Sequence, residues 1–482
     1  MRYSLITNLL ALTLFLSSCS VGPDYVRPED SISTEFRNSA SKESVELKKW
    51  WEGFQDPILN QLIEESITSN LSFREAQARV KEARALYIGS RSSFFPIPNL
   101  TTSYSRTKGS ENAIGAQSGG SGNNNGFQAI EERNLYQAGF DATWEIDIFG
   151  GIRREVESAK SQYEAQIESS RDVLISLLGE VAQSYLNLRS AQTRLNITLE
   201  NIKSEEETLD IQKTRQSVGI ASDLTVAQSE AQLKSISAQL PALEIPIQQS
   251  IHRLSVLLGK EPNALYEQLK NPTNIIKGPI NVPSGLPSDL LKRRPDIRQA
   301  ERLLQAATAE IGVAVSDFFP KLQITGNIGF RSENTSNLIS SGSKYWAVGP
   351  NISWGILNWY AILANIDIQN ARQEQALLTY KQIVLESLEE VENNLFAYNR
   401  EQERTRILKE SVDASQRALD HAKVLYSSGV LDFLNVLNSQ RTLYQAQDTH
   451  AQSQQTSAAY LIALYKSLGG GWESIEEKMQ QD

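Results

Sequence analysis

Phe94-Phe95-Pro96 recurs as Phe318-Phe319-Pro320, and this repeated motif is the first sign that the chain contains one structural plan twice. Each copy follows a helical stretch with an Arg-x-Ala pattern, at Arg74 in the first half and at Arg298 in the second. Self-similarity over such a distance is typical of architectures built from repeated supersecondary units. It argues against a catalytic domain with one unique pocket.

Beyond this motif the two halves correspond at a constant offset of about 210 positions. Trp144 corresponds to Trp354, and Gly219 corresponds to Gly429. The offset before the motif is larger, because the polar tract after the first copy is longer than the tract after the second. Repeated units tolerate such length differences in surface loops, so we expect both tracts to lie at the surface.

The charge balance excludes one large class of function. The chain of 482 residues has 47 basic and 57 acidic side chains, which gives a formal net charge of −10. Nucleic-acid binding needs a basic surface, so we expect no nucleic-acid partner.

The first 18 residues are typical of an export signal, with Arg2 ahead of a short apolar run. The run ends at Cys19, preceded by small residues in a pattern typical of lipidation. Cys19 is the single cysteine of the chain and cannot form an intrachain disulfide. We therefore expect a lipid anchor at Cys19, although an ordinary signal peptide that contains a cysteine is the alternative. Ser20, rather than Asp, follows it and favours sorting to the outer membrane of a Gram-negative bacterium.

Four segments show the alternation of apolar and polar residues that is typical of membrane β-strands, and the first of them shows it most weakly. They are residues 98–106, 135–146, 322–331 and 346–354. Trp144 and Trp354 lie at the ends of the apolar faces, where an aromatic girdle belongs. A soluble sandwich with one wet face is the alternative, because Asp and Glu also alternate with the aromatic residues. No other segment approaches the ~20 apolar residues of a membrane helix.

Long helices are predicted around these strands. One runs over residues 58–92, and two very long ones run over 152–217 and 362–427. Because a helix rises 1.5 Å per residue, ~65 residues make a rod of ~100 Å. Each rod is expected to break at Gly219 or Gly429 and to return through a second helix. Pro241 and Pro246 should kink or interrupt only the first return helix.

Four membrane strands cannot close a barrel, and an open edge in lipid leaves costly unpaired backbone groups. We therefore expect several chains to share one barrel, and a cyclic homotrimer with about twelve strands is the simplest closed assembly. The predicted fold class is a mixed membrane protein: a trimeric β-barrel with four strands per chain, continued by a long α-helical barrel, with internal duplication. The same symmetry gathers the helical rods into one cylinder.

The domain organisation follows from these features. The predicted segments are a signal peptide (1–18), a lipidated extended segment (19–57), a first repeat (58–258) with a strand pair (97–147) and a helical tip (217–224), a Pro-rich connector (259–290) lying against the rods, a second repeat (291–472) with a strand pair (320–356) and a tip (427–434), and a C-terminal tail (473–482).

Together these features resemble the outer membrane efflux proteins of the TolC type, and more closely their NodT/OprM lipoprotein branch. The resemblance covers essentially the whole mature chain. The residues that carry it are Cys19–Tyr25 with Arg27-Pro28, Phe149-Gly150-Gly151, Val181–Tyr185, Arg293–Ile297, Phe318–Pro320 and Leu468–Trp472. It implies a trimeric exit duct that works with a periplasmic adaptor protein and an inner-membrane pump of the RND, ABC or MFS type. It implies no cofactor.

The resemblance also assigns roles to the two tips. It implies that Asp432 is a constricting carboxylate, which threefold symmetry turns into a ring that favours cations. Asn435 stands where some relatives carry a second Asp, and Asp223 is the related candidate in the first tip. Ser222, Asp223 and Asp432 are also suited to start a helix, which is the alternative interpretation. The adaptor-docking residues implied are Gly219, Ser222, Leu224, Gly429, Leu431 and Leu434.

The sequence bears on three other functions. An enzyme is disfavoured because the sequence has no HExxH, GxSxG or P-loop motif, and because His252, His421 and His450 are isolated. Glu145 and Asp147 could pair, but in a strand both would face the lumen as polar lining residues. A surface coiled-coil lipoprotein would leave the amphipathic strands unexplained. A type I duct for secreted proteins or peptides stays open, since the sequence does not identify the cargo.

Overall fold

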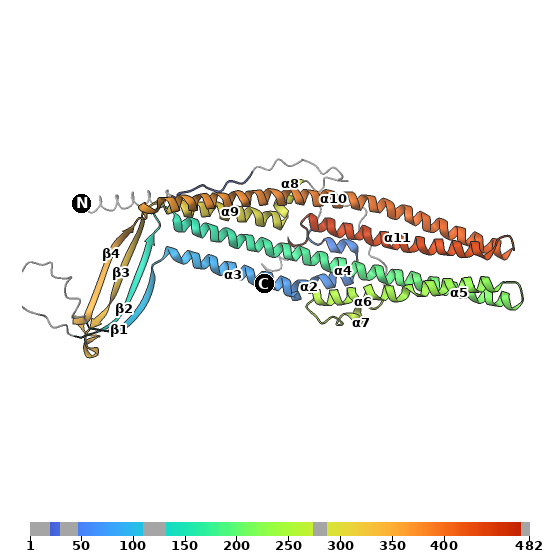
Figure 1. Ribbon diagram of the computed structural model, residues 1–482, viewed down its shortest axis with the longest axis horizontal. Helices are drawn as coiled ribbons and strands as arrows, with labels where there is room; N and C mark the ends of the chain where they lie inside the picture. Colours follow the sequence, from blue (N-terminus) through green and yellow to red (C-terminus); the bar gives the residue numbers. More distant parts are fainter. Residues whose placement is uncertain (1–19, 29–46, 109–131, 273–286, 474–482) are drawn as a thin grey trace, which may run out of the picture. The chain divides into compact units, whose positions relative to one another are not determined.

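The computed structural model describes residues 20–28, 47–108, 132–272 and 287–473 (Figure 1). These residues form two compact units, and each unit takes segments from both repeats. The first unit contains the sheet and the helix ends that adjoin it. The second unit contains most of the helical structure. Cys19 and the predicted C-terminal tail after residue 473 lie outside the described residues.

The sheet of the first unit has four antiparallel strands in the order β1-β2-β3-β4 (Figure 1). The strands are β1 Ile97–Thr107, β2 Arg133–Ile146, β3 Lys321–Ser332 and β4 Lys344–Ser353. All four predicted strands are confirmed, and every strand end lies within two residues of the predicted one. β2 pairs with β3, so the hairpin of one repeat is joined to the hairpin of the other.

The register places the alternating apolar residues of all four strands on one face. Leu100 pairs with Phe140, Phe140 with Ile328, and Ile328 with Trp346. All four side chains are more than half exposed within the chain. A row of large apolar side chains open to the surroundings is typical of a face that is covered by lipid or by another protein.

The helices occupy both units. They are α2 Pro57–Ser69, α3 Leu71–Arg91, α4 Gly151–Ser217, α5 Asp223–Ser237, α6 Gln239–Leu257, α7 Tyr266–Leu269, α8 Pro287–Arg293, α9 Pro295–Ser316, α10 Trp359–Ser427 and α11 Phe433–Ser467. Helices α4 and α10, with 67 and 69 residues, are the two predicted long helices. Within the described residues, no helix combines the length and the apolar character needed to cross a bilayer.

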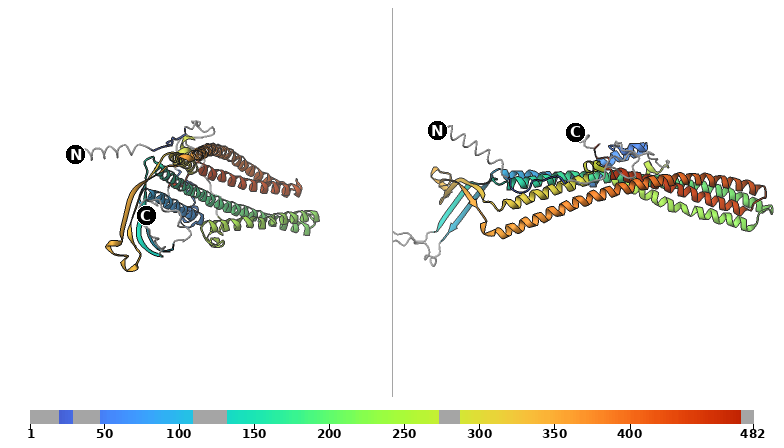
Figure 2. Two further views of the ribbon diagram at one scale, coloured as in Figure 1. Left: turned by 60° about the vertical axis from the view of Figure 1, so that its left-hand side comes forward. Right: turned by 90° about the horizontal axis from the view of Figure 1, so that it is seen from above.

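The two return helices differ as predicted. The first is interrupted at Ala238 and divided into α5 and α6, whereas α11 continues through the corresponding region without a break (Figures 1 and 2). Pro241 explains the interruption, because a proline ring clashes with the carbonyl four residues earlier, here that of Ser237 at the end of α5. Pro246 is accommodated inside α6.

The duplication is reproduced in individual hydrogen bonds. The indole N–H of Trp144 donates to the carbonyl oxygen of Phe94 at 2.9 Å. The indole N–H of Trp354 donates to the carbonyl oxygen of Phe318 at 3.0 Å. Both bonds tie the end of a strand pair back to the Phe-Phe-Pro motif that begins it, so the repeated sequence motif and the repeated tryptophan are one structural device.

The single helix predicted over residues 58–92 is wrong, because it is divided at Asn70 into α2 and α3. The Asn70 side chain accepts from the Phe73 N–H at 2.9 Å and donates to the carbonyl oxygen of Leu257 at 2.8 Å. The second repeat breaks at the equivalent place, where Arg294 donates to the carbonyl oxygen of Ser467 at 2.8 Å. Leu257 and Ser467 are the last residues of their return helices. Each break therefore satisfies an orphan carbonyl at a helix end.

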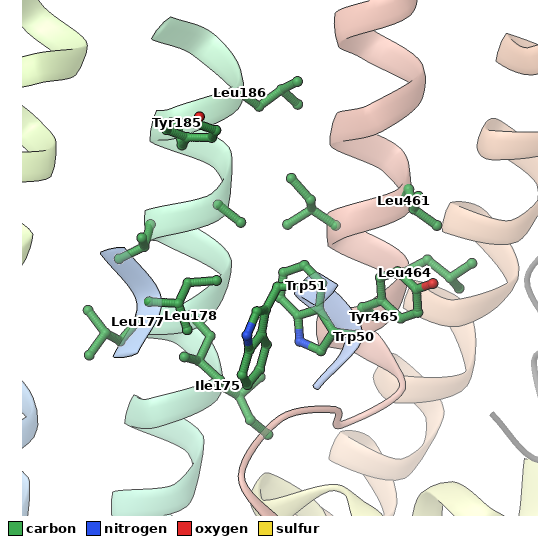
Figure 3. Packing of buried hydrophobic residues seen from close by; sticks show 14 of the residues in the cluster. Trp50, Trp51, Ile175, Leu177, Leu178, Tyr185, Leu186, Leu461, Leu464 and Tyr465 are labelled. Atoms are coloured by element: carbon green, nitrogen blue, oxygen red, sulfur yellow. The ribbon is translucent and has the colours of Figure 1, made fainter. Parts of the chain in front are cut away.

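The main hydrophobic core lies in the second unit. A short 3-10 helix η1, Trp50–Phe54, inserts its two tryptophans between α4 and α11 (Figure 3). Trp50 stacks on Tyr465 with ring centroids 5.2 Å apart, and Leu178 of α4 is fully buried in the same cluster. This packing joins residues that are about 400 positions apart in sequence, so it fixes the long helices against each other.

The described part of the Pro-rich connector lies against α4, as predicted. Leu265 and Leu269 are buried. The side chains of Gln192 and Arg189 donate to the carbonyl oxygens of Leu269 at 2.7 Å and Asn271 at 2.9 Å. Residues 273–286 of this connector lie outside the described residues.

Candidate functional site

The two helical tips have the same backbone turn. Gly219 follows α4 with φ +77°, and Gly429 follows α10 with φ +74°. In the first tip, the Gly219 and Ile220 N–H groups donate to the carbonyls of Gln216 and Arg215 at 2.9 and 2.8 Å. This is the Schellman arrangement, in which glycine adopts the left-handed conformation at low cost.

The second tip repeats these two bonds at equivalent positions. The Gly429 N–H donates to the Tyr426 carbonyl at 3.0 Å, and the Val430 N–H donates to the Leu425 carbonyl at 2.9 Å. Helices α4 and α10 thus end just before Gly219 and Gly429, where the sequence predicts the breaks, and the two turns differ in their side chains.

The first tip is closed by polar groups. The Ser222 hydroxyl accepts a hydrogen bond from the Thr225 N–H at 3.3 Å, so Ser222 is the N-cap of α5. The Asp223 carboxylate accepts from the Gln216 side-chain amide at 2.6 Å, which links the end of α4 to the start of α5. Asp223 is thus held inside its own tip by a local bond.

The second tip is closed by aromatic groups at the same positions. Tyr426 corresponds to Gln216, and Phe433 corresponds to Asp223. The two rings lie with centroids 5.5 Å apart, and Phe433 is buried with Leu419, Val436 and Leu437 in a small separate core. The tip of α10 and α11 therefore has an apolar anchor that the first tip lacks.

Asp432 occupies the N-cap position of α11 but its side chain makes no capping hydrogen bond. Its carboxylate is exposed and has no hydrogen bond or ion pair with any group in the described ranges. The neighbouring Asn435 is also exposed, and its side chain makes only a long 3.4 Å contact with the Asp432 carbonyl oxygen. The capping interpretation is thus correct for Ser222 and wrong for the Asp432 side chain, which is free to act on other molecules.

The predicted docking residues of the tips are mostly exposed. Leu224 is 65% exposed and Leu434 is 51% exposed, and both glycines lie in open space with no atom within 4 Å of an added Cβ. Leu431 is half-buried. Val218, Ile220 and Val430, which the sequence interpretation left out, are about as exposed as Leu224. Exposed branched side chains beside a glycine turn are the signal that would have identified them.

The two hairpins are linked to each other near the tips. The Tyr426 hydroxyl donates to the Gln212 side-chain oxygen of α4 at 3.0 Å, and the Arg215 guanidinium lies 4.6 Å from the Tyr426 ring centroid. Movement of one tip therefore has to break or carry along these contacts. Tyr426 belongs to the second tip, so it couples the aromatic tip to the polar one.

Deeper in the same helices lies a buried carboxylate that sequence reasoning missed. Glu205 of α4 is fully buried, and neither carboxylate oxygen has a hydrogen-bond partner in the described part of the chain. Burial raises the pKa of Glu205 to about 7, against a weaker opposing effect of the Lys423 ammonium. No pattern in the sequence separates Glu205 from its exposed neighbours Glu206 and Glu207.

Residues 20–28 are fixed to the first unit directly after the predicted lipidation site. The Val21 N–H donates to the Phe149 carbonyl at 3.0 Å, and the buried Arg154 donates to the Val21 carbonyl at 3.2 Å and to the Asp24 carboxylate at 2.6 Å. Phe149 lies three residues after the end of β2. Residues 20–25 and Phe149–Gly151, which belong to two motifs singled out separately in the sequence, thus meet in the structure.

Asp147 has a different place from the one predicted. It lies beyond the end of β2, so it is not a lining residue of that strand. Its two carboxylate oxygens accept from the backbone N–H groups of Ile152 and Arg153 at 3.1 and 2.9 Å and therefore cap the start of α4. Glu145, one strand period earlier, stays on the polar face and contacts the Gln323 amide at 3.4 Å.

In the described ranges, no group of three or more His, Cys, Asp or Glu side chains could hold a metal ion. His252 forms hydrogen bonds with the side chains of Gln248 and Asn263 at 2.6 and 3.0 Å, an amide network at the surface.

The comparisons with known proteins agree with this geometry. The model of the family described as "Outer membrane efflux protein" matches residues 62–260 and 286–470, a large majority of the chain. This chain belongs to the outer membrane efflux protein family. The two matched segments coincide closely with the two predicted repeats.

Individual members are similar over nearly their full length. Nodulation protein T of Rhizobium leguminosarum bv. trifolii is 30% identical, over 96% of this chain and 97% of that protein. The probable efflux pump outer membrane protein TtgC of Pseudomonas putida is 31% identical, over 96% and 95%. The solved structure of the outer-membrane channel OprN has a TM-score of 0.86 at 34% identity and covers 94% of this chain and all of that one. The predicted family, fold class and role in outer-membrane efflux are confirmed at this level.

Proposed function

We propose that three copies of this chain form the outer-membrane exit duct of a tripartite efflux pump, which takes substrate from an inner-membrane pump and a periplasmic adaptor. The arrangement of the four-stranded sheet is the observation that supports this proposal most strongly. Its apolar residues share one face in register, and its edge strands β1 and β4 each have a single neighbour in the described chain. In lipid such edges need partners, and three sheets of four strands satisfy them by closing into a ring.

Helix α10 supports association with further copies. In the second unit Val424 and Leu425 are exposed near the end of the helix. Its other exposed large apolar side chains there are Leu378, Leu385, Phe396 and Ile407. They are 7, 11 and 11 residues apart, spacings that keep side chains on one face of a helix. An apolar stripe of this kind on an otherwise polar helix favours burial against another long helix.

The tips are proposed as gate and docking surface. Asp432 carries an uncommitted carboxylate, and a symmetric ring of three would favour cations and repel itself. Asp223 is occupied by Gln216, so Asp432 is the stronger gate candidate, with Asn435 beside it. The exposed Leu224 and Leu434, beside the turns at Gly219 and Gly429, fit a docking surface for the adaptor, together with Ser222 and Leu431.

A lipid at Cys19 would add a second membrane contact to the strands. Val21 is hydrogen-bonded to Phe149, just beyond the end of β2, so acyl chains on Cys19 would lie near the end of the sheet at which β2 leads toward α4. This is the level at which an anchor in the inner leaflet of the outer membrane would be useful. Labelled palmitate should enter the wild type but not Cys19→Ser, and equal incorporation would refute the anchor.

The duct itself is tested by the mass and the conductance of the purified full-length protein in detergent. We expect a particle of three chains whose β-structure in circular dichroism persists on proteolysis, and which conducts ions in a planar bilayer. A monomer, or a trimer that never conducts, would contradict the proposal and would favour the surface coiled-coil lipoprotein.

A further inference from the structure

The polar face of the sheet has an ordered distribution of charge. We call the end where β2 leads toward α4 the helix end, and the opposite end the loop end. Asp141 and Glu145 lie toward the helix end of β2, whereas Arg133 and Arg331 lie toward the loop end of β2 and β3. The register places Arg331 opposite Gln137, on the same face as the two carboxylates.

Arg331 is held in a defined position by neighbouring strands. Its Nε and Nη2 groups donate to the Gln137 side-chain oxygen at 3.3 and 3.0 Å. Its guanidinium carbon lies 4.8 Å from the centroid of the Tyr345 ring on β4. The Gln137 amide donates in turn to the Tyr345 hydroxyl at 2.9 Å, so the three side chains form a closed arrangement. A stacked and hydrogen-bonded guanidinium loses less side-chain freedom when it meets an anion.

A glycine makes room for this arrangement. Gly139 lies beside the Tyr345 ring, and a Cβ at Gly139 would come within 3.1 Å of the Tyr345 hydroxyl and 2.7 Å of the Ile328 carbonyl oxygen. A larger residue would displace the tyrosine on which the guanidinium rests. Gly139 of β2 therefore leaves the space in which Tyr345 of β4 packs against Arg331 of β3.

Arg331 has no counter-carboxylate. Among the described residues it makes no ion pair, its side chain is exposed, and its Nη1 group makes no hydrogen bond. Glu333, two residues beyond Arg331 and outside β3, makes no ion pair with it. Along the strands, the nearest acidic residue on this face is Asp141, which pairs in register with Asn327. At about 3.3 Å per residue that level is about 13 Å along the strand, and Glu145 is about 26 Å away. The carboxylate of Asp141 is already bound by Thr101 at 2.7 Å.

Three other basic residues near the sheet differ from Arg331. Arg133, at the loop end of the same face, is exposed, and its side chain makes no hydrogen bond or ion pair among the described residues, so its position is not fixed as that of Arg331 is. Lys321, at the helix end, is paired with Asp317 at 2.9 Å. Arg106 lies on the opposite, apolar face and is paired with Glu132. Arg331 is thus a fixed cation with an unused donor on the polar face.

We propose that Arg331 is an anion-selectivity residue at the loop end of the duct, with Tyr345 and Gln137 as its positioning residues. This inference rests on the proposed function, in which the polar face lines the lumen and three copies of Arg331 form one level. Small anionic solutes such as chloride and organic carboxylates are then attracted to the exit, while the carboxylates nearer the helix end favour cations. The two levels make the lumen electrically asymmetric along its length.

The test is the reversal potential of the purified full-length protein in a planar bilayer under a potassium chloride gradient. Low ionic strength is required, because the Debye length is about 30 Å at 0.01 M but only about 3 Å at 1 M. We expect Arg331→Gln to lower the chloride-to-potassium permeability ratio by about twofold or more at low salt, and to have no effect at 1 M.

Three variants make the result specific. Arg106→Gln changes the net charge equally but on the apolar face, and should leave the ratio at the wild-type value. Arg331→Lys keeps the charge without the planar fork and should retain most of the selectivity. Tyr345→Leu keeps the arginine but removes its support, and should lower the ratio partly.

The outcomes distinguish a failure of this inference from a failure of the proposed function. An Arg331→Gln channel with the wild-type ratio at low salt, or one that Arg106→Gln matches, overturns the role of Arg331 and leaves the duct intact. Absence of conductance in the wild type overturns the proposed function instead. If Arg331→Gln does not assemble into trimers, the contrast between Tyr345→Leu and Arg106→Gln decides the question.

Discussion

The two helical tips share one turn and differ in how the turn is closed. Their backbone hydrogen bonds occur at equivalent positions, with glycines at nearly the same φ. The first tip is closed by a Gln216–Asp223 bond and a Ser222 cap, the second by a Tyr426–Phe433 contact above an apolar core. The two copies thus share the turn, which depends only on the backbone and its glycine. They differ in the side chains, which decide whether the tip is closed by polar groups or by an apolar core.

The two tips also differ in how their acidic side chains are engaged. The polar tip uses its own acid in a local bond, whereas the aromatic tip is stabilised from beneath and leaves Asp432 uncommitted. A carboxylate that does not stabilise its own helix can be removed at little cost in stability, so it is available for function.

Removing the aromatic anchor should have the largest effect on stability. Phe433→Ala deletes a buried ring and should lower the free energy of unfolding by about 3–5 kcal/mol. Its counterpart Asp223→Ala removes one exposed hydrogen bond and should cost about 1 kcal/mol or less. Thermal unfolding of the purified variants measures both. Equal losses would show that the second tip is not anchored by its core.

The buried carboxylate of the first hairpin should make stability depend on pH. Glu205 has a raised pKa of about 7 in the folded chain, so the folded state holds a proton that the unfolded state has released above about pH 4.3. Stability therefore falls as pH rises between about 4.3 and 7, by on the order of 3 kcal/mol, and stays low above that range. The equivalent position in α10 is Ser415, which has no charge to bury.

Glu205→Gln should remove the share of Glu205 in this dependence and be more stable than the wild type at pH 8, while Asp172, whose pKa burial also raises, keeps its own share. The exposed neighbour Glu206→Gln is the matched control and should keep the wild-type pH profile. Melting temperatures of the purified protein between pH 5 and pH 8 provide the measurement. A profile for Glu205→Gln that falls as steeply as that of the wild type would mean that Glu205 is not the titrating group.

The helix caps should give the smallest difference. Ser222→Ala removes the cap of α5 and should cost about 1 kcal/mol, whereas Asp432→Ala should cost less than about 0.5 kcal/mol because its side chain caps nothing. The same unfolding experiment compares them. A larger loss for Asp432→Ala would restore the capping role and weaken its assignment to the gate.

Most of the fold could be predicted from the sequence because its signals are local or periodic. Alternation located β1 to β4, and the helical spacing with Gly219 and Gly429 located both long hairpins. The position of the return-helix interruption followed from Pro241. These features depend on the backbone, and the duplication shows each of them twice.

The remaining features depend on partners that are distant in sequence. The helix break at Asn70 is stabilised by a carbonyl 187 positions away, which no local pattern shows. Asp147 continues the strand alternation but caps α4, because the chain turns before it reaches the next strand position. The free state of Asp432 and the burial of Glu205 likewise depend on which helices pack around them.

The central claim is that this chain forms an outer-membrane duct whose closed state is set by the second tip. Single-channel conductance of the purified trimer tests it most directly, with Asp432→Ala compared with Asp223→Ala. We predict that Asp432→Ala raises the closed-state conductance and reduces block by divalent cations, while Asp223→Ala leaves both at wild-type values. Unchanged conductance and block in Asp432→Ala, or the same change in both variants, would contradict the account.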